Sequence, residues 1–187
     1  DGDALGQDLG QRLGAGVGGR VHAPIVESRP RRRDRRPEDT GTSPTIAGMK
    51  HLLPKEAWAW LQAETARRAA QGQDAPLFVD VRMEIESLYV GRPPGVENIP
   101  WYEYPDLTPD PARFAAAVAR EAGSRLRPVL LICRSGKRTL EAGAVLEAAG
   151  FAEVAHVVHG FEGDLDEHFK RSTLNGWRFE GLPWEQM

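Results

Sequence analysis

The hydrophobic residues of the chain form a regular pattern only from Met49 onward. Runs that are apolar at nearly every position, at residues 77–81, 129–132 and 154–158, are typical of strands buried on both faces. Between these runs, longer stretches repeat apolar residues at the helical period and are bounded by proline or glycine. This alternation predicts an α/β fold with three layers, a mostly parallel central sheet and helices on both of its faces.

The remaining pattern completes this prediction. The helical stretches are residues 54–66, 112–122 and 137–149, with one or two further turns at 83–88 and a short helix at 165–169. A short strand is predicted at 96–101, and the Gly- and Pro-rich residues 91–95 must form a loop. Because ligand sites of open parallel sheets lie beyond the carboxyl ends of the strands, the residues that follow each strand are the candidates for chemistry.

Residues 1–48 differ from the rest of the chain in composition. They lack a sustained apolar period, are rich in glycine, and contain a run of arginines and prolines at 28–37. Such a segment cannot bury enough apolar surface to offset an ordering entropy of about 1–2 kcal/mol per residue. We therefore expect a disordered tail over 1–48 and one folded domain over 49–187. Met49 is a candidate for the natural start of translation, and the mass of the protein made in its own host would test this.

Charge and cysteine content limit the classes of function. The net charge is −3, and the tail carries 8 Arg against 7 acidic residues, so the domain itself is mildly acidic. Nucleic acid is not an expected ligand of such a domain; the arginine run could bind nucleic acid or an anionic surface, but a solvated linker is the simpler interpretation. No apolar run reaches the roughly 20 residues of a membrane helix, and we expect no membrane partner. The single cysteine excludes an internal disulfide, and the absence of a visible secretory signal favours the cytoplasm.

The cysteine stands where the apolar run 129–132 ends. The six residues that follow Cys133 are all polar or glycine, and three are cations: Arg134, Ser135, Gly136, Lys137, Arg138 and Thr139. A free thiol is only about 3% thiolate at pH 7. The N-terminus of the following helix, a tight loop of backbone amides and the cations each favour the thiolate by about 1 kcal/mol or less. A cysteine that merely fills the core does not need such a loop, so we predict that Cys133 is a nucleophile.

Residues 133–139 resemble the active-site loop of the rhodanese (thiosulfate:cyanide sulfurtransferase) family, single-domain type. Upstream, Asp80-Val81-Arg82, then Glu86, then residues 91–100 resemble the family's Asp-x-Arg, Glu and Gly-His-Ile-Pro-Gly-Ala to Asn-Ile-Pro signature. Downstream, residues 160–163 take the place of its Gly-Gly turn, and residues 176–177 and 181–183 resemble its end. The resemblance covers roughly residues 49–184.

The sequence departs from the family pattern at two places. Arg92 replaces the usual histidine, and Phe161 with Glu162 interrupts the Gly-Gly turn. Neither departure affects the nucleophile, so the predicted chemistry is unchanged. Both departures make the assignment to a subfamily less definite.

The resemblance implies a rhodanese-like fold and a thiosulfate sulfurtransferase. Cys133 would take the outer sulfur of thiosulfate or a related donor, hold it as a persulfide, and pass it to cyanide, a thiol or a sulfur-carrier protein, with ping-pong kinetics. The loop residues would bind the substrate: Arg134, Ser135, Gly136, Lys137, Arg138 and Thr139. Asp80 and Arg82 would support the loop, and no metal or organic cofactor is implied.

Two alternatives remain open. The first is a sulfur-relay or binding module, in which Cys133 receives its persulfide from a partner protein. The second is a phosphatase or arsenate reductase of the same fold. The phosphatase pattern places an arginine six positions after the cysteine, whereas here Arg138 stands at the fifth position and Thr139 at the sixth. This shorter loop argues against phosphoryl transfer.

Other conspicuous residues carry weaker expectations. His156 and His159 are three apart on a strand and should face opposite sides, so a shared metal is not expected. His51 looks isolated and either structural or exposed. Trp101 follows a predicted strand and is a candidate for the mouth of the site.

Overall fold

The computed structural model describes residues 48–187, and the expectations for residues 1–47 lie outside this range. Five strands form one sheet: β1 (Lys50–Leu52), β2 (Leu77–Asp80), β3 (Glu97–Asn98), β4 (Val129–Ile132) and β5 (Val154–Val157). Their order is β1-β5-β4-β2-β3, and every pairing within this sheet is parallel. The strand that precedes Cys133, β4, therefore lies at the centre of the sheet.

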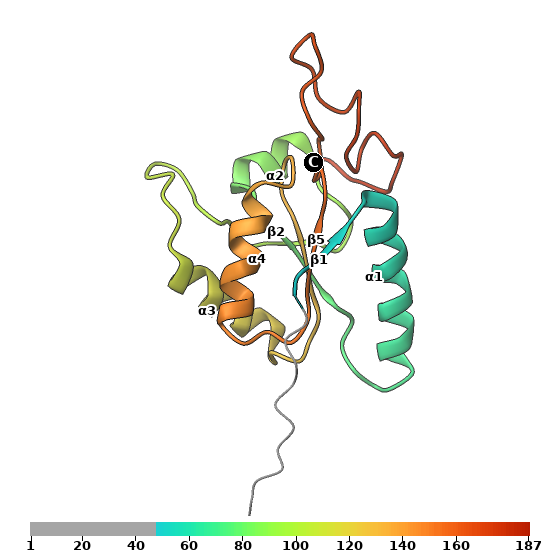
Figure 1. Ribbon diagram of the computed structural model, residues 1–187, viewed down its shortest axis with the longest axis vertical. Helices are drawn as coiled ribbons and strands as arrows, with labels where there is room; N and C mark the ends of the chain where they lie inside the picture. Colours follow the sequence, from blue (N-terminus) through green and yellow to red (C-terminus); the bar gives the residue numbers. More distant parts are fainter. Residues whose placement is uncertain (1–47) are drawn as a thin grey trace, which may run out of the picture. The chain divides into compact units, whose positions relative to one another are not determined.

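Within residues 48–187, four helices complete the three layers: α1 (Pro54–Ala69), α2 (Glu84–Val90), α3 (Pro111–Ala122) and α4 (Arg138–Ala148). Figure 1 shows α1 on one side of the sheet and α3 with α4 on the other. The predicted α/β fold with helices on both faces is confirmed.

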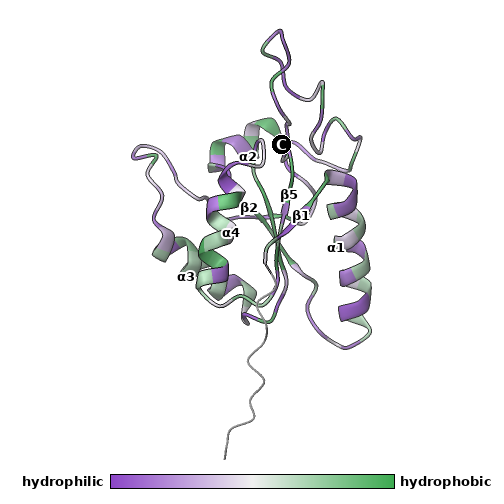
Figure 2. Cartoon of the chain, in the orientation of Figure 1, coloured by the Kyte–Doolittle hydropathy of each residue, from purple (hydrophilic) through white to green (hydrophobic). Residues whose placement is uncertain are grey.

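The central strands are buried on both faces, as their uninterrupted apolar runs predict. In β4, Val129 and Leu131 pack into the core beneath α3 and α4, whereas Leu130 and Ile132 pack into the core beneath α1. All four side chains have no exposed surface. Figure 2 shows hydrophobic strands between helices, with hydrophilic residues on the outer side of α1. The two apolar cores clamp β4 and so fix the position of the residue at its carboxyl end.

Local sequence signals set the helix ends close to their predicted bounds. Pro111 occupies the first turn of α3, and the Asp110 carboxylate accepts a hydrogen bond from the amide of Arg113 at 3.0 Å. The same helix ends at Gly123, whose φ of 68° is left-handed. In α1, Pro54 again stands in the first turn.

Two local predictions were wrong, and one strand was missed. The strand β1 was not predicted. It has only three residues, lies at the edge of the sheet and shows no clear pattern of apolar positions. The strand predicted at 96–101 is reduced to Glu97–Asn98. Residues 165–169 form turns instead of a helix, because the Asp166 carboxylate accepts the amides of His168 and Lys170, which competes with helical hydrogen bonding.

The segment after β5 returns to the α1 face of the sheet. The Trp177 ring is fully buried and lies 5.7 Å from the rings of both Trp58 and Phe78. Two turns cross closely at Gly163 and Gly176, where a Cβ on Gly163 would stand 2.0 Å from the carbonyl oxygen of Asn175. Among residues 48–187, no helix combines the length and the apolar character needed to cross a membrane.

Candidate active site

The Cys133 side chain lies directly beyond β4, at the carboxyl end of the central strand. Its Sγ atom accepts a hydrogen bond from the backbone amide of Gly136 at 3.1 Å, and the residue is 1% exposed. Gly136 has a φ of 83°, and a Cβ at this position would stand 2.9 Å from the backbone nitrogen of His159. Only glycine therefore allows the turn that aims this amide at the sulfur.

The loop ends at the N-terminus of α4, which begins at Arg138. The first amides of a helix have no partner inside the helix, and the helix dipole places partial positive charge there. A negative charge on Sγ would be favoured by this end of α4 and by the Gly136 amide. The predicted order of buried strand, tight loop and helix N-terminus is present in the structure, and stabilisation of a thiolate stays a prediction.

A second turn supports the loop from below. The amide of Phe161 donates to the carbonyl oxygen of Cys133 at 2.7 Å, and the amide of Glu162 donates to that of Arg134 at 2.9 Å. A Cβ on Gly160 would stand 2.3 Å from the Cys133 carbonyl oxygen, so the first glycine of this turn is required. The substitution of Phe161 and Glu162 for the family's second glycine leaves both of these backbone contacts in place.

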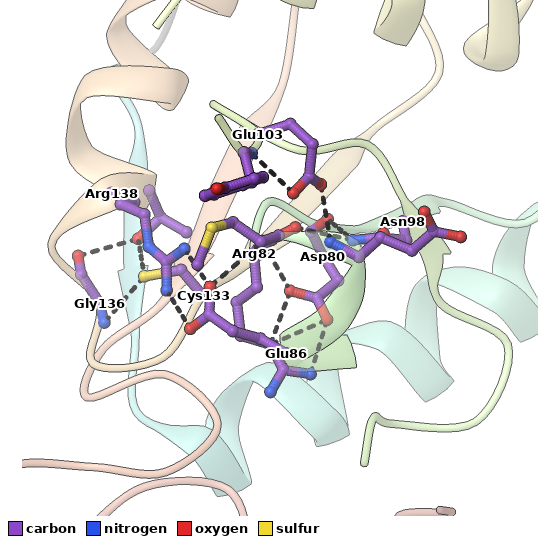
Figure 3. Close-up of polar contacts among 12 residues, drawn as sticks. Asp80, Arg82, Glu86, Asn98, Glu103, Cys133, Gly136 and Arg138 are labelled. Atoms are coloured by element: carbon purple, nitrogen blue, oxygen red, sulfur yellow. Dashed lines mark hydrogen bonds and ion pairs between the residues drawn. The ribbon is translucent and has the colours of Figure 1, made fainter. Parts of the chain in front are cut away.

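The Arg138 guanidinium is fixed by a two-pronged ion pair with Glu86 on α2, at 2.7 and 2.8 Å (Figure 3). Burial disfavours the charge of both groups, but their mutual hydrogen bonds and attraction outweigh it. As a result the pKa of Arg138 is raised and the pKa of Glu86 is lowered from their ordinary values. A thiolate at Cys133 would further favour the charged form of Arg138. The pair ties α4 to α2 and holds a permanent positive charge near the sulfur.

Removal of the Glu86 charge tests this pair. We expect Glu86→Gln to lower the free energy of unfolding by about 2 kcal/mol, because a largely buried Arg138 loses its counter-charge. Urea denaturation measures the change. Glu84 is an exposed carboxylate on the same helix, and Glu84→Gln should change the free energy of unfolding by no more than about 0.5 kcal/mol. Equal effects of the two substitutions would contradict this role of Glu86.

At the carboxyl end of the neighbouring strand β2, Asp80 and the nearby Arg82 form a fully buried ion pair. Arg82 donates from Nε and Nη2 to the Asp80 carboxylate at 2.7–2.9 Å, and Nη2 also donates to the carbonyl oxygen of Gly91 at 2.7 Å. The guanidinium lies 4.5 Å from the centre of the Phe161 ring, which belongs to the turn beneath the cysteine loop. The side-chain amide of Asn98 donates to the carbonyl oxygens of both Asp80 and Arg82 (Figure 3). The pair thus connects β2, β3 and the turn at 160–163.

The remaining predicted site residues divide into two groups. Arg134 and Lys137 are exposed and make no ion pair within residues 48–187, so their charges face solvent at the mouth of the loop. Ser135 is partly exposed beside them. Thr139 is buried, and its Oγ1 lies 3.9 Å from Sγ of Cys133 and 2.9 Å from the carbonyl oxygen of Gly136.

A pair of histidines that the site prediction did not include lies beside Thr139, and one of the two contacts it directly. His156, in β5, is 3% exposed, and its Nδ1 lies 3.0 Å from the Thr139 hydroxyl. Its Nε2 lies 2.7 Å from Nδ1 of His51, so the expectation of an isolated His51 was wrong. Burial, and secondarily the proximity of His51, lowers the pKa of His156 to about 4. The sequence signal that could have pointed to His156 is its place as a polar residue inside the apolar run 154–158.

This lowered pKa has a consequence for stability. Near pH 6 the unfolded chain protonates His156, whereas the folded chain keeps it neutral, so stability should fall as the pH drops from about 6.5 to about 4. The slope should approach 1.4 kcal/mol per pH unit, roughly 3 kcal/mol in all. Urea denaturation at several pH values measures it. Carboxylates act at lower pH, because their ordinary pKa values lie near 4.

The control for this slope is a change of histidine elsewhere. His156→Leu should lose the slope between pH 6.5 and 5, whereas the exposed His168→Gln should keep it. An unchanged slope in His156→Leu would show that another group binds the proton on unfolding.

Two further expectations concern the surroundings of the site. Trp101 is 4% exposed, packs against Phe114 and donates to Glu141 at 3.2 Å, so it belongs mainly to the core. Arg92, in place of the family's histidine, pairs with Glu185 by backbone and side chain and thereby fixes the C-terminal segment. A groove of about 1120 Å³ runs along β3 and α3, but no residue of the loop 133–139 lines it.

Known proteins share this fold and this sequence pattern. The model of the Rhodanese-like domain family matches residues 59–167. The crystal structure of Rv0390 from M. tuberculosis is 33% identical with a TM-score of 0.62, and the match covers 75% of this chain and all of that one. The crystal structure of thiosulfate sulfurtransferase from Pseudomonas aeruginosa is 19% identical with a TM-score of 0.50; the match covers 74% of this chain and 20% of that protein. A search of curated proteins found no match. The chain belongs to the rhodanese-like domain family.

Proposed function

We propose that this protein is a sulfurtransferase that carries a sulfane sulfur as a persulfide on Cys133. The observation that supports it most is the Gly136 amide held 3.1 Å from Sγ, in a loop that opens at the N-terminus of α4. Fixed donors around a sulfur atom stabilise the negative charge of the thiolate before the reaction and of the persulfide after it. Membership of the rhodanese-like family agrees with this chemistry.

The first half-reaction loads the cysteine. The Cys133 thiolate attacks the outer sulfur of thiosulfate, a new sulfur–sulfur bond forms at Sγ, and the sulfur–sulfur bond of the donor breaks. Sulfite leaves with the electron pair of the broken bond, and the transferred sulfur keeps one negative charge. Arg134 and Lys137, exposed beside the sulfur, would attract the dianionic donor and favour the departure of sulfite.

The second half-reaction empties the cysteine. Cyanide or a thiolate attacks the outer sulfur, the bond between this sulfur and Sγ breaks, and Sγ becomes a thiolate again. Donor and acceptor use the same site in turn, so ping-pong kinetics are expected. No second cysteine exists in the sequence, so an internal disulfide cannot compete with the persulfide.

The burial of Cys133 favours a small donor over a partner protein. At 1% exposure, its sulfur is reached more easily by a small anion than by the cysteine of a folded partner. Arg138 also differs from a phosphate clamp, because Glu86 already occupies both of its outer nitrogens. The sulfur-relay module and the phosphatase therefore rank behind the sulfurtransferase.

Intact-mass measurement tests the proposal directly. After incubation with thiosulfate, the protein should gain the mass of one sulfur atom, and addition of cyanide should remove it and release thiocyanate. We choose thiosulfate because the Pseudomonas aeruginosa neighbour bears the name of a thiosulfate sulfurtransferase.

Each other outcome identifies an alternative. No gain from thiosulfate, together with rapid loading by a cysteine desulfurase, would replace the proposal with the relay module. Hydrolysis of an aryl phosphate that is lost in Cys133→Ser would replace it with the phosphatase.

A further inference from the structure

A continuous line of polar atoms leads from the buried sulfur to the surface on the α4 side of the sheet. It runs from Cys133 Sγ to Thr139 Oγ1 at 3.9 Å, from Oγ1 to His156 Nδ1 at 3.0 Å, and from His156 Nε2 to His51 Nδ1 at 2.7 Å. His51 itself is exposed at the edge strand β1. The sulfur-transfer chemistry proposed above uses neither histidine.

The fold places these residues together by register and by close helix packing. His51 and His156 are direct partners in the parallel β1–β5 ladder, and His156 faces Leu131, two residues before Cys133 in β4. Helix α4 approaches β1 closely at Gly143, where a Cβ would stand 2.2 Å from the sulfur of Met49. This approach sets Thr139, one turn earlier on the same face, against His156.

The hydrogen-bonding capacity of the line permits two proton arrangements. In the first, the Cys133 thiol points at Thr139 Oγ1, the Thr139 hydroxyl donates to Nδ1 of His156, and Nε2–H of His156 donates to His51. In the second, the Thr139 hydroxyl donates to the carbonyl oxygen of Gly136, which lies at 2.9 Å, Nδ1–H of His156 donates to Thr139, and His51 donates to Nε2.

These two arrangements are the start and the end of one proton transfer. The S–H bond breaks and its electron pair stays on Sγ. Thr139 Oγ1 takes this proton and gives its own to Nδ1 of His156, and His156 gives the proton of its Nε2 to Nδ1 of His51. His51 receives the last proton and becomes an imidazolium that releases it to water. Atoms and charges balance, because one thiol and one neutral imidazole become one thiolate and one imidazolium.

We propose that Thr139, His156 and His51 form a proton path that carries the Cys133 proton out of the buried site. The proposal rests on the proposed role of Cys133 as the nucleophile. Its physical reason is burial, because a thiol that is 1% exposed has little direct contact with water that could accept its proton. His156 suits an inner position because it stays neutral in the fold, with a pKa lowered to about 4, and so can accept and donate at once.

Most other charged groups near the path have partners. On the elements packed against His156, Lys50 pairs with Glu153, Arg138 pairs with Glu86, and Glu141 accepts from Trp101. Glu147, further along α4, has one buried carboxylate oxygen without a hydrogen-bond partner among residues 48–187, and no hydrogen bond joins it to the path. The thiol, Thr139 and the two histidines contact one another in sequence, so the proton passes between these groups.

The tautomer of His156 tests the path without any sulfur donor. In the full chain with ¹⁵N-labelled histidines, long-range ¹H–¹⁵N spectra should show the His156 proton moving from Nε2 to Nδ1 in step with thiolate absorbance. The single cysteine of the sequence makes that absorbance specific to Cys133. In Cys133→Ala the step that tracks the thiolate should vanish. If the His156 tautomer does not change when Cys133 ionises, the proposal is overturned.

A kinetic test uses the exposed end of the path, where substitution does not disturb the core. In weak buffer, His51→Phe should load sulfur from thiosulfate at least about tenfold more slowly than the parent, and added imidazole should restore the rate. His168→Phe, a matched change at an exposed histidine outside the path, should load normally. A normal rate in His51→Phe without imidazole would overturn the path. If the parent itself forms no persulfide, the proposed function fails, and the tautomer experiment still decides the path.

Discussion

Cys133→Ser should lower sulfur transfer from thiosulfate to cyanide by at least about 1,000-fold, because a hydroxyl cannot replace the thiolate that forms the persulfide. The sequence holds no second cysteine to replace it, and the loop amide of Gly136 donates to this sulfur. Steady-state release of thiocyanate measures the loss.

The same substitution separates chemistry from folding. Serine is close to cysteine in volume, and Cys133 is buried. The free energy of unfolding of the variant should therefore lie within about 1–2 kcal/mol of that of the parent. Its intact mass should not change on incubation with thiosulfate. A variant that folds normally and keeps full activity would show that Cys133 does not carry the sulfur.

The central part of the fold was predictable because the residue types along each segment there reflect the burial of that same segment. The runs of β2 and β4 are apolar at successive positions, which is expected only when both faces of a strand are covered. The break from Ile132 to the polar loop located the site, since a buried strand ends there and a helix begins at Arg138. In each case the signal and the structure involve neighbours in sequence.

The contacts that complete the site join residues far apart in sequence, and one sequence alone does not report such pairs. His51 meets His156 only because β1 and β5 are adjacent in the sheet, and β1 was itself too short to predict. The ion pair between Glu86 and Arg138 joins α2 to α4. Glu86 was noticed through the family resemblance, but its partner depended on how two helices meet above the sheet.

The fully buried pair of Asp80 and Arg82 should be the most sensitive ionic contact of the domain. We expect Asp80→Asn to lower the free energy of unfolding by about 3–5 kcal/mol, because Arg82 would keep its charge without water or a counter-charge. Nη1 of Arg82 already lacks a hydrogen-bond partner among residues 48–187, so the guanidinium depends on the contacts that its other nitrogens make. Against a typical total stability of about 5–15 kcal/mol, this is a large part. Urea denaturation measures the change.

An exposed ion pair of the same geometry supplies the control. Glu64 receives a two-pronged contact from Arg67 on the surface of α1, and Glu64→Gln should cost no more than about 1 kcal/mol. A similar small cost for Asp80→Asn would contradict the role of burial. Replacement of both partners, Asp80→Leu with Arg82→Met, should recover much of the lost stability, because no unpaired charge remains.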